Sequence, residues 1–200
     1  MIAKLARLLA VLASLAISGP TVAADKLSDD GLHIEPFFLI SLLDLRDDLR
    51  EAQESGKRFA VVWEQRGCPY CRDMHEINFA MPPIADYVRD NFVMVQLNLY
   101  GAREVTDFDG QVLPEKDLAR KWGILFTPTI LYFPETVADD NKRPGRDLTV
   151  MQMPGYFRPG HFYGMFRYVR EKRYADTHFQ KFIVEQADEI HRVLGVGPLQ

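Results

Sequence analysis

Apolar and polar positions along the chain follow two periods, one typical of strands and one typical of helices. Short apolar runs predict buried strands over residues 59–63, 92–99, 126–133 (in its second half) and 148–153. Apolar residues recurring every three or four positions predict helices over residues 37–55, 83–90, 114–122 and 177–194, with others beginning at Pro69 and near Pro159. Asp109-Gly110 predicts a small hairpin turn between two of these elements. The order of elements predicts one α/β domain with extra helices at its N-terminal and C-terminal ends.

The first residues have the pattern of a secretory signal peptide. Lys4 and Arg7 precede an almost wholly apolar run over residues 8–17, and small residues follow it. A positive start, a short apolar core and small residues before the cut are the marks of such a peptide, so we expect cleavage after Ala23 or Ala24. The chain then divides into a cleaved signal peptide (1–24), a flexible polar segment (25–36) and the folded domain (37–200).

The alternative to cleavage is a retained membrane anchor, but the apolar run is shorter than the roughly 20 residues that span a bilayer. We therefore expect the mature protein in an extracytoplasmic space, the periplasm in a bacterium, without stable membrane insertion. Removing the signal peptide leaves 22 basic and 28 acidic residues, a net charge of −6. A negative surface argues against nucleic acid and anionic lipid as partners.

Both cysteines of the chain lie together, as Cys68-Pro69-Tyr70-Cys71, directly after the first predicted strand. Proline suits the first position of a helix, so the two thiols are expected at a helix N-terminus. There the unpaired N–H groups and the helix dipole favour the thiolate, which is the reactive form of cysteine. This placement predicts that Cys68 attacks disulfides and that Cys71, one turn later, resolves the mixed disulfide.

Three other roles for the cysteine pair compete with this one. A purely structural disulfide closing so short a loop restrains little unfolded-chain entropy. A haem attachment site needs histidine directly after the second cysteine, where Arg72 stands. A metal site could use Cys68, Cys71 and His75, but no second Cys-x-x-Cys or histidine pair completes a tetrahedral shell. We expect His75 to be a residue of the helix face, and we expect no metal and no cofactor besides the redox-active Cys68–Cys71 pair.

The motifs and their order resemble the thioredoxin superfamily. The resemblance rests on Cys68-Pro69-Tyr70-Cys71, on Ala119-Arg120-Lys121-Trp122-Gly123-Ile124 before Thr127-Pro128-Thr129, and on Gly155-Tyr156. It implies a central mixed β-sheet flanked by helices. It also implies that Pro128 is cis and lies against the active-site disulfide, and that backbone groups of Thr127 pair with an extended substrate segment. Pro69 and Tyr70, between the cysteines, are expected to contact the substrate as well.

Within the superfamily, residues 67–75 and the long insertion over residues 97–110 resemble the SoxW-type periplasmic thioredoxins associated with sulfur oxidation. This narrower resemblance implies a reductant of disulfides or persulfides on sulfur-oxidation proteins, recharged by a membrane electron donor. Protein thiols and disulfides of the periplasm are then the expected partners.

Two positions depart from the family pattern. Thioredoxins place a buried acid six residues before the first cysteine, where this chain has Val62. Glu64, on the same strand face by alternation, is a candidate proton acceptor in its place, the alternative being an ordinary charge at the strand end. The tryptophan usual before the motif is replaced by Gly67, and Trp63 is expected in the core.

The sequence thus predicts an enzyme, a periplasmic thiol–disulfide oxidoreductase. Two alternatives stay open: a disulfide oxidase or isomerase acting on newly secreted proteins, and a metal-handling module using the two cysteines. The direction of the reaction depends on how strongly the reduced thiolate is stabilised, which the sequence does not determine.

Overall fold

A four-stranded sheet forms the centre of the computed structural model, which describes residues 27–138 and 140–195. The strand order is β2-β1-β5-β6, with β1 parallel to β2 and antiparallel to β5, and β5 antiparallel to β6. The sheet is therefore mixed. Its strands are β1 (Arg58–Glu64), β2 (Phe92–Asn98), β5 (Thr129–Tyr132) and β6 (Met151–Pro154).

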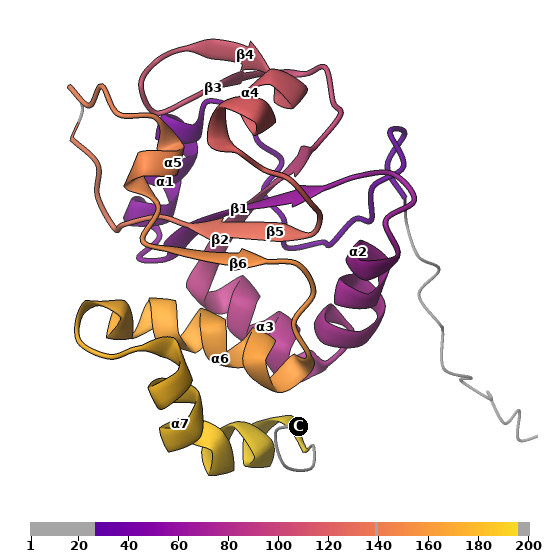
Figure 1. The fold of residues 1–200 in the computed structure, drawn as a ribbon, viewed down its shortest axis with the longest axis vertical. Coiled ribbons are helices and arrows are strands. Elements are labelled where there is room, and N and C mark those ends of the chain that lie inside the picture. The colour runs from indigo at the N-terminus through magenta and orange to yellow at the C-terminus, as the bar shows by residue number, and fades with distance from the viewer. Residues whose placement is uncertain (1–26, 139, 196–200) are drawn as a thin grey trace, which may run out of the picture.

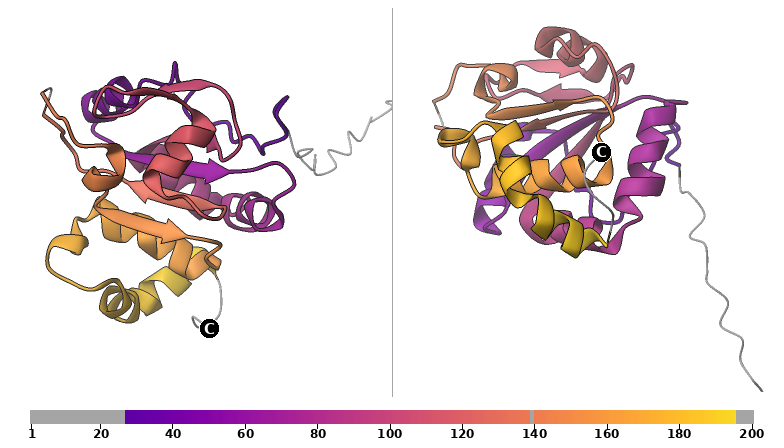
Figure 2. Two further views of the ribbon diagram at one scale, coloured as in Figure 1. Left: turned by 45° about the horizontal axis from the view of Figure 1, so that its top comes forward. Right: turned by 60° about the horizontal axis from the view of Figure 1, so that its bottom comes forward.

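Helices cover both faces of the sheet (Figures 1 and 2). One face carries α3 (Pro82–Asn91) and α6 (Pro159–Arg170), and α7 (Phe179–Leu194) packs on the side of α6 that faces away from the sheet. The opposite face carries α1 (Leu45–Glu54), α4 (Glu115–Trp122) and the short α5 (Gly145–Leu148). After the end of β1 comes α2 (Pro69–Asp73), which continues into the π-helix η1 (Met74–Phe79). The remaining elements are the strands of a small hairpin, β3 (Glu104–Thr106) and β4 (Val112–Pro114), and the 3-10 helix η2 (Arg173–Ala175).

Alternation along β1 divides the apolar core into two layers. Val62 packs with Met74 of η1 and Phe166 of α6 on one face. Trp63 faces the other side, where its ring meets Trp122 edge-on at 5.9 Å. Trp63 is fully buried, which confirms its predicted place in the core. Because successive strand residues point to opposite faces, Glu64 shares the face of Val62 and η1.

Strand pairing brings two distant segments to one end of the sheet. Trp63 of β1 pairs with Thr129 of β5, and the two strands are antiparallel. The chain that leaves β1 toward Cys68 therefore runs beside the chain that enters β5 through Thr127 and Pro128.

The helix predicted over residues 37–55 begins only at Leu45, so its first half was predicted wrongly. The segment before it pairs with the edge of the sheet instead: Phe38 bridges Met94 of β2, and the Leu39 N–H donates to the Met94 carbonyl at 2.8 Å. Asp44 then caps α1 by accepting from the Arg46 N–H. Leu42, an apolar residue within the predicted helix, is 99% exposed.

The second half of the chain follows the prediction more closely. The helices at residues 114–122, from Pro159, and near the C-terminus form within two residues of their predicted ends, as does the hairpin. The last strand begins at Met151 and not at residue 148, because the chain first makes α5. The Gly145 N–H that opens α5 donates to Asp107 Oδ1 at 2.8 Å, and Trp122 Nε1 donates to Oδ2. Asp107 is thus a buried anchor that ties α5 to Trp122 of α4.

The predicted flexible segment overlaps residues 27–36, which lie along the end of the sheet. Leu32 in it is buried. Arg66 Nε donates to the Asp30 carbonyl at 3.0 Å, and Gln96 Nε2 donates to the His33 carbonyl at 2.7 Å. These contacts hold the segment against the ends of β1 and β2. The predicted signal peptide, residues 1–24, lies outside the described residues.

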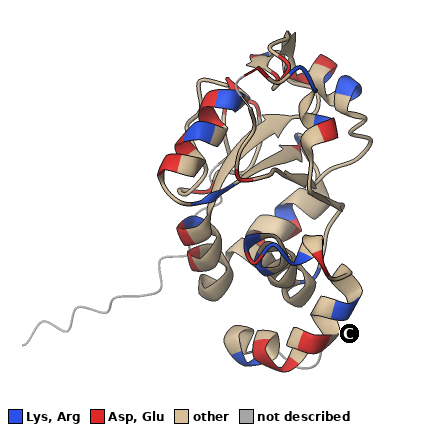
Figure 3. Ribbon diagram, turned by 90° about the vertical axis from the view of Figure 1, so that its left-hand side faces the viewer, with Lys and Arg blue, Asp and Glu red and all other residues tan. Residues whose placement is uncertain are grey.

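Charged residues of both signs are interspersed along the helices in the view of Figure 3. None of the helices in the described part of the chain has the length and apolar character needed to cross a membrane.

Candidate active site

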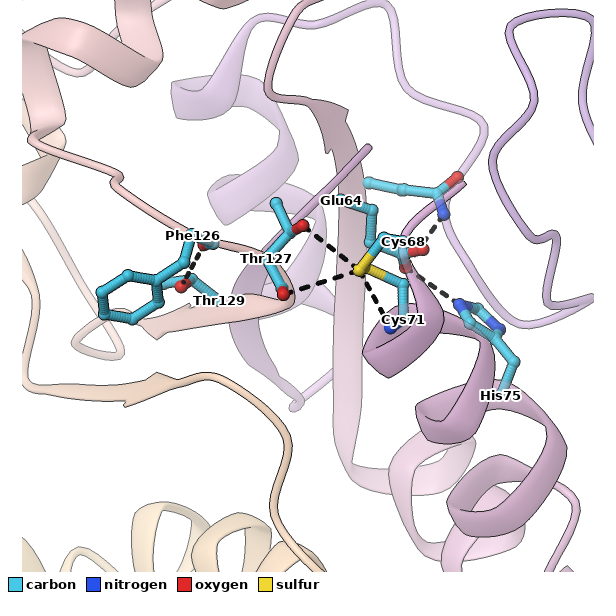
Figure 4. Close-up of a disulfide and its surroundings, with 8 residues drawn as sticks. Glu64, Cys68, Cys71, His75, Phe126, Thr127 and Thr129 are labelled. Atoms are coloured by element: carbon cyan, nitrogen blue, oxygen red, sulfur yellow. Dashed lines mark hydrogen bonds and ion pairs between the residues drawn. A yellow bond between two sulfur atoms is a disulfide. The ribbon is translucent and has the colours of Figure 1, made fainter. Parts of the chain in front are cut away.

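The two cysteines form a disulfide at the start of α2, with Cα atoms 5.2 Å apart. Cys68 is the N-cap of the helix, and the Cys71 N–H donates to Cys68 Sγ at 3.0 Å (Figure 4). Pro69 takes the first helical position, where a missing N–H costs nothing. Cys68 keeps 5% of its surface exposed, whereas Cys71 is fully buried. The sulfur of Cys68 is therefore the one that a second protein can approach.

The segment entering β5 closes over Cys68 from the other side. The Thr127–Pro128 peptide bond is cis. The Thr127 hydroxyl donates to Cys68 Sγ at 3.2 Å, and the Thr127 carbonyl oxygen lies 3.5 Å from the same sulfur. The Gly155 N–H donates to the Pro128 carbonyl at 2.7 Å, which ties this segment to the end of β6. Two donors, one from α2 and one from Thr127, thus converge on a single sulfur.

Replacing Thr127 with valine removes one of these donors without changing the shape of the side chain. A hydrogen bond to a charged acceptor contributes about 1.5–3 kcal/mol, so less Cys68 thiolate should form in the reduced protein. We expect iodoacetamide to alkylate reduced Cys68 about tenfold more slowly at pH 6. Thr129→Val is the matched control, because the Thr129 hydroxyl donates to the Phe126 carbonyl and not to sulfur. Equal rates in the two variants would show that Thr127 does not stabilise the thiolate.

Exposed apolar and aromatic side chains flank Cys68. Tyr70 is 59% exposed, and its ring stacks on Tyr156 with centroids 6.3 Å apart. Leu125 and Phe126, directly before Thr127, are also exposed. Pro69, Tyr70 and Tyr156 form an apolar rim beside the disulfide, and Leu125 and Phe126 lie in the segment that leads to Thr127. A contact of Pro69 and Tyr70 with substrate stays a prediction.

Glu64 lies buried behind the disulfide helix (Figure 4). Its Oε1 accepts from His75 Nε2 at 2.9 Å and from Gln96 Nε2 at 3.1 Å, while its Oε2 has no hydrogen-bond partner. A carboxylate is rarely buried so completely unless it pairs with a cation or a hydrogen-bond donor. Glu64 is therefore more than the ordinary charge at a strand end that was the alternative interpretation.

His75 sits between two carboxylates. Its Nδ1 lies 2.7 Å from Glu35 Oε1, and its ring stacks on His33 with centroids 5.0 Å apart. Burial alone would lower the pKa of His75, but the hydrogen bonds and charges of Glu35 and Glu64 raise it to about 9. His75 is therefore an imidazolium at neutral pH and donates to both acids.

The sequence interpretation did not bring Glu35 or Gln96 to the site. One usable signal was the spacing of Cys71 and His75, four residues apart on a helix, which places both on one face. No local pattern identifies Glu35, because its contact with His75 depends on how residues 27–36 fold back. Within residues 27–138 and 140–195, no three histidine, cysteine or acidic side chains are grouped as a metal site.

A domain of this kind, with a Cys-x-x-Cys disulfide at a helix N-terminus beside a mixed sheet, defines a class of redox proteins. A model of the thioredoxin-like domain family matches residues 45–170, well over half of the chain. The chain therefore belongs to the thioredoxin-like family. This confirms the predicted superfamily and the predicted α/β fold with a mixed sheet flanked by helices; the narrower SoxW-type resemblance stays a prediction.

Other comparisons give distant similarity. No curated protein matches the chain. A thioredoxin-fold protein from Helicobacter pylori is 18% identical, with the match covering 70% of this chain and 83% of the other at a TM-score of 0.49. A thioredoxin from Thermus thermophilus is 22% identical, with 63% and 83% covered and a TM-score of 0.46. Family membership and the Cys68–Cys71 disulfide together support thiol–disulfide oxidoreductase activity.

Proposed function

We propose that this protein is a periplasmic reductant of disulfides or persulfides on partner proteins. The observation that carries the proposal is the Cys68–Cys71 disulfide, with Cys68 Sγ under the Thr127 hydroxyl and next to the cis Thr127–Pro128 bond. The periplasmic location rests on the signal-peptide pattern of residues 1–24. No resident cofactor is needed, because the dithiol itself carries the two electrons.

The reaction proceeds in two exchanges. The Cys68 thiolate attacks one sulfur of the partner disulfide, forms a mixed disulfide and releases the other sulfur as a thiolate. Cys71 then loses its proton, attacks Cys68 Sγ and releases the second partner thiolate, leaving the Cys68–Cys71 disulfide. Two electrons pass from the dithiol to the partner. With a persulfide, the same two electrons release the outer sulfur as hydrosulfide.

The apolar rim around Cys68 supports a protein partner. Tyr70, Leu125 and Phe126 are exposed, and Thr127 lies two residues before β5. An extended segment of a partner can therefore add beside Thr127 and place its disulfide over Cys68. A membrane electron donor would return the protein to the dithiol form through the same surface, and the sulfur-oxidation proteins implied by the SoxW-type resemblance are the proposed substrates.

The proton of Cys71 needs an acceptor, and we assign this role to Glu64. The resolving cysteine is fully buried, so bulk water is not available to it. Glu64 is buried on the strand face that supports the helix, and its Oε2 is unpaired. A positioned base accelerates such a proton transfer by about a hundredfold or more.

The test of the proposed function is the reduction potential of the Cys68/Cys71 pair. The mature protein is equilibrated with graded thiol–disulfide buffers, and free thiols are trapped and counted; Cys68→Ser, which cannot close the disulfide, is the control. A reductant should have a potential near or below about −230 mV. A value near −120 mV would instead assign an oxidase. If no reversible two-electron transition appears, the redox function is wrong.

A further inference from the structure

The structure contains a buried ionic unit, Glu35–His75–Glu64, that joins the N-terminal segment to the redox centre. We propose that Glu35 and His75 are positioning residues for the resolving step, holding Glu64 as the carboxylate that takes the proton of Cys71. The inference rests on the proposed function and extends it. It assigns a chemical role to a segment that lies outside the residues matched by the family model.

Geometry links the unit to Cys71 and not to Cys68. Cys71 and His75 are four residues apart in the continuous helical stretch of α2 and η1, and both are buried. Side chains at this spacing lie one above the other on the same helix face. Glu64, 2.9 Å from His75, is therefore on the side of the helix to which Cys71 points, as Figure 4 shows. Glu64 Oε1 accepts hydrogen bonds from His75 and Gln96. Glu64 Oε2 has no hydrogen-bond partner and can receive a proton.

The charges of the unit favour that transfer. An imidazolium between two carboxylates carries one net negative charge, and the buried end of the unit is completely shielded from water. Burying an uncompensated charge is costly, so taking up one proton at Glu64 makes the buried unit neutral. The rings of His33, Phe38 and Phe79 also pack against the His75 ring.

Glu35 stabilises the protonated form of His75 and orients its ring. It is the outer member of the unit, with 16% of its side chain exposed, and it accepts from His75 Nδ1 while Glu64 accepts from Nε2. Hydrogen bonds on both ring nitrogens fix the ring plane as well as the charge. Without Glu35 the imidazolium keeps only one of its two hydrogen-bonded carboxylates, and the cation beside Glu64 is held less tightly.

Cys71–SH gives its proton to the Glu64 carboxylate, the Cys71 thiolate attacks Cys68 Sγ, and the sulfur held in the mixed disulfide leaves as a thiolate. With glutathione as the probe, the products are the Cys68–Cys71 disulfide, glutathione thiolate and protonated Glu64.

The test uses the full mature protein, reduced and then mixed with glutathione disulfide. Acid quenching and mass spectrometry follow the glutathione adduct on Cys68, which separates attack by Cys68 from release by Cys71. In Glu35→Gln we expect release at pH 7 to slow about tenfold, and its pH midpoint to move upward, while the attack rate stays within about twofold of wild type. His75→Gln and Glu64→Gln should slow release further, by about a hundredfold.

Glu76→Gln is the matched control. Glu76 lies next to His75 in the sequence but is half exposed and faces Arg72, so its release rate and pH midpoint should equal those of wild type. Glu35→Gln removes a partly exposed group, and it keeps the inference testable even if His75→Gln fails to fold. A wild-type release rate and pH midpoint in Glu35→Gln would overturn the inference while leaving the proposed function intact. Absence of any reversible dithiol–disulfide cycle in the wild type would overturn the proposed function itself.

Discussion

Replacing Cys68 with serine is expected to reduce disulfide-reducing activity to the uncatalysed rate, because a serine hydroxyl does not exchange with disulfides. Replacing Cys71 with serine should leave the first exchange intact and remove the second. The Cys71→Ser protein should therefore accumulate as a mixed disulfide with its substrate. Insulin reduction in the presence of dithiothreitol measures the first effect, and mass spectrometry of the trapped adduct measures the second.

The two variants also test the assignment of roles. If Cys71 were the attacking residue, Cys71→Ser would lose the first exchange and Cys68→Ser would trap the adduct. Thermal unfolding of both variants in the reduced state is the control for folding, since Cys71 is completely buried and serine places a hydroxyl there.

The stability of the protein is expected to fall as the pH rises from about 6.5 to about 9. His75 has a pKa near 9 in the folded protein, against an ordinary value of 6.5. A raised pKa means that the folded state holds its proton more tightly, so the stabilisation is complete below pH 6.5 and is lost above pH 9. The size of the loss is roughly 3 kcal/mol in the free energy of unfolding. Urea unfolding at several pH values across this range measures it.

His75→Gln should lack this pH dependence and should also be less stable at pH 6.5, because Glu64 and Glu35 lose their cation. Removing one partner of a buried ion pair costs about 3–5 kcal/mol. Asp48, whose pKa is raised to about 6 by burial, affects stability only below this window and does not confuse the comparison. A wild-type slope between pH 6.5 and 9 in His75→Gln would contradict the assignment of the pKa to His75.

Local patterns predicted most elements of this fold, because those elements satisfy their own backbone and bury one apolar face. The run at Arg58–Glu64 and the helix from Pro69 are of this kind. Residues 37–44 were different. Their apolar spacing fits a helix, but the free edge of β2 offered carbonyl groups such as that of Met94, and pairing there replaced the first two helical turns.

The residues of the candidate active site also differ in how far the sequence alone predicts them. Cys68 and Cys71 are adjacent in sequence and carry their own signal, and Thr127-Pro128 is recognisable from the family motif. The contact of Glu35 with His75 spans 40 residues and depends on the path of the N-terminal segment. The π-helical turn at Met74–Phe79, which carries His75, also has no sequence signature that we could use.

An edge strand exposes a row of backbone N–H and C=O groups to which a strand of another molecule can add, so it is a starting point for aggregation. In this protein β2 is such a strand. Phe38 and Leu39 occupy its edge at Met94, and a second chain would have to displace them in order to pair there. The same stretch of chain that brings Glu35 to His75 therefore also blocks strand addition at this edge of the sheet.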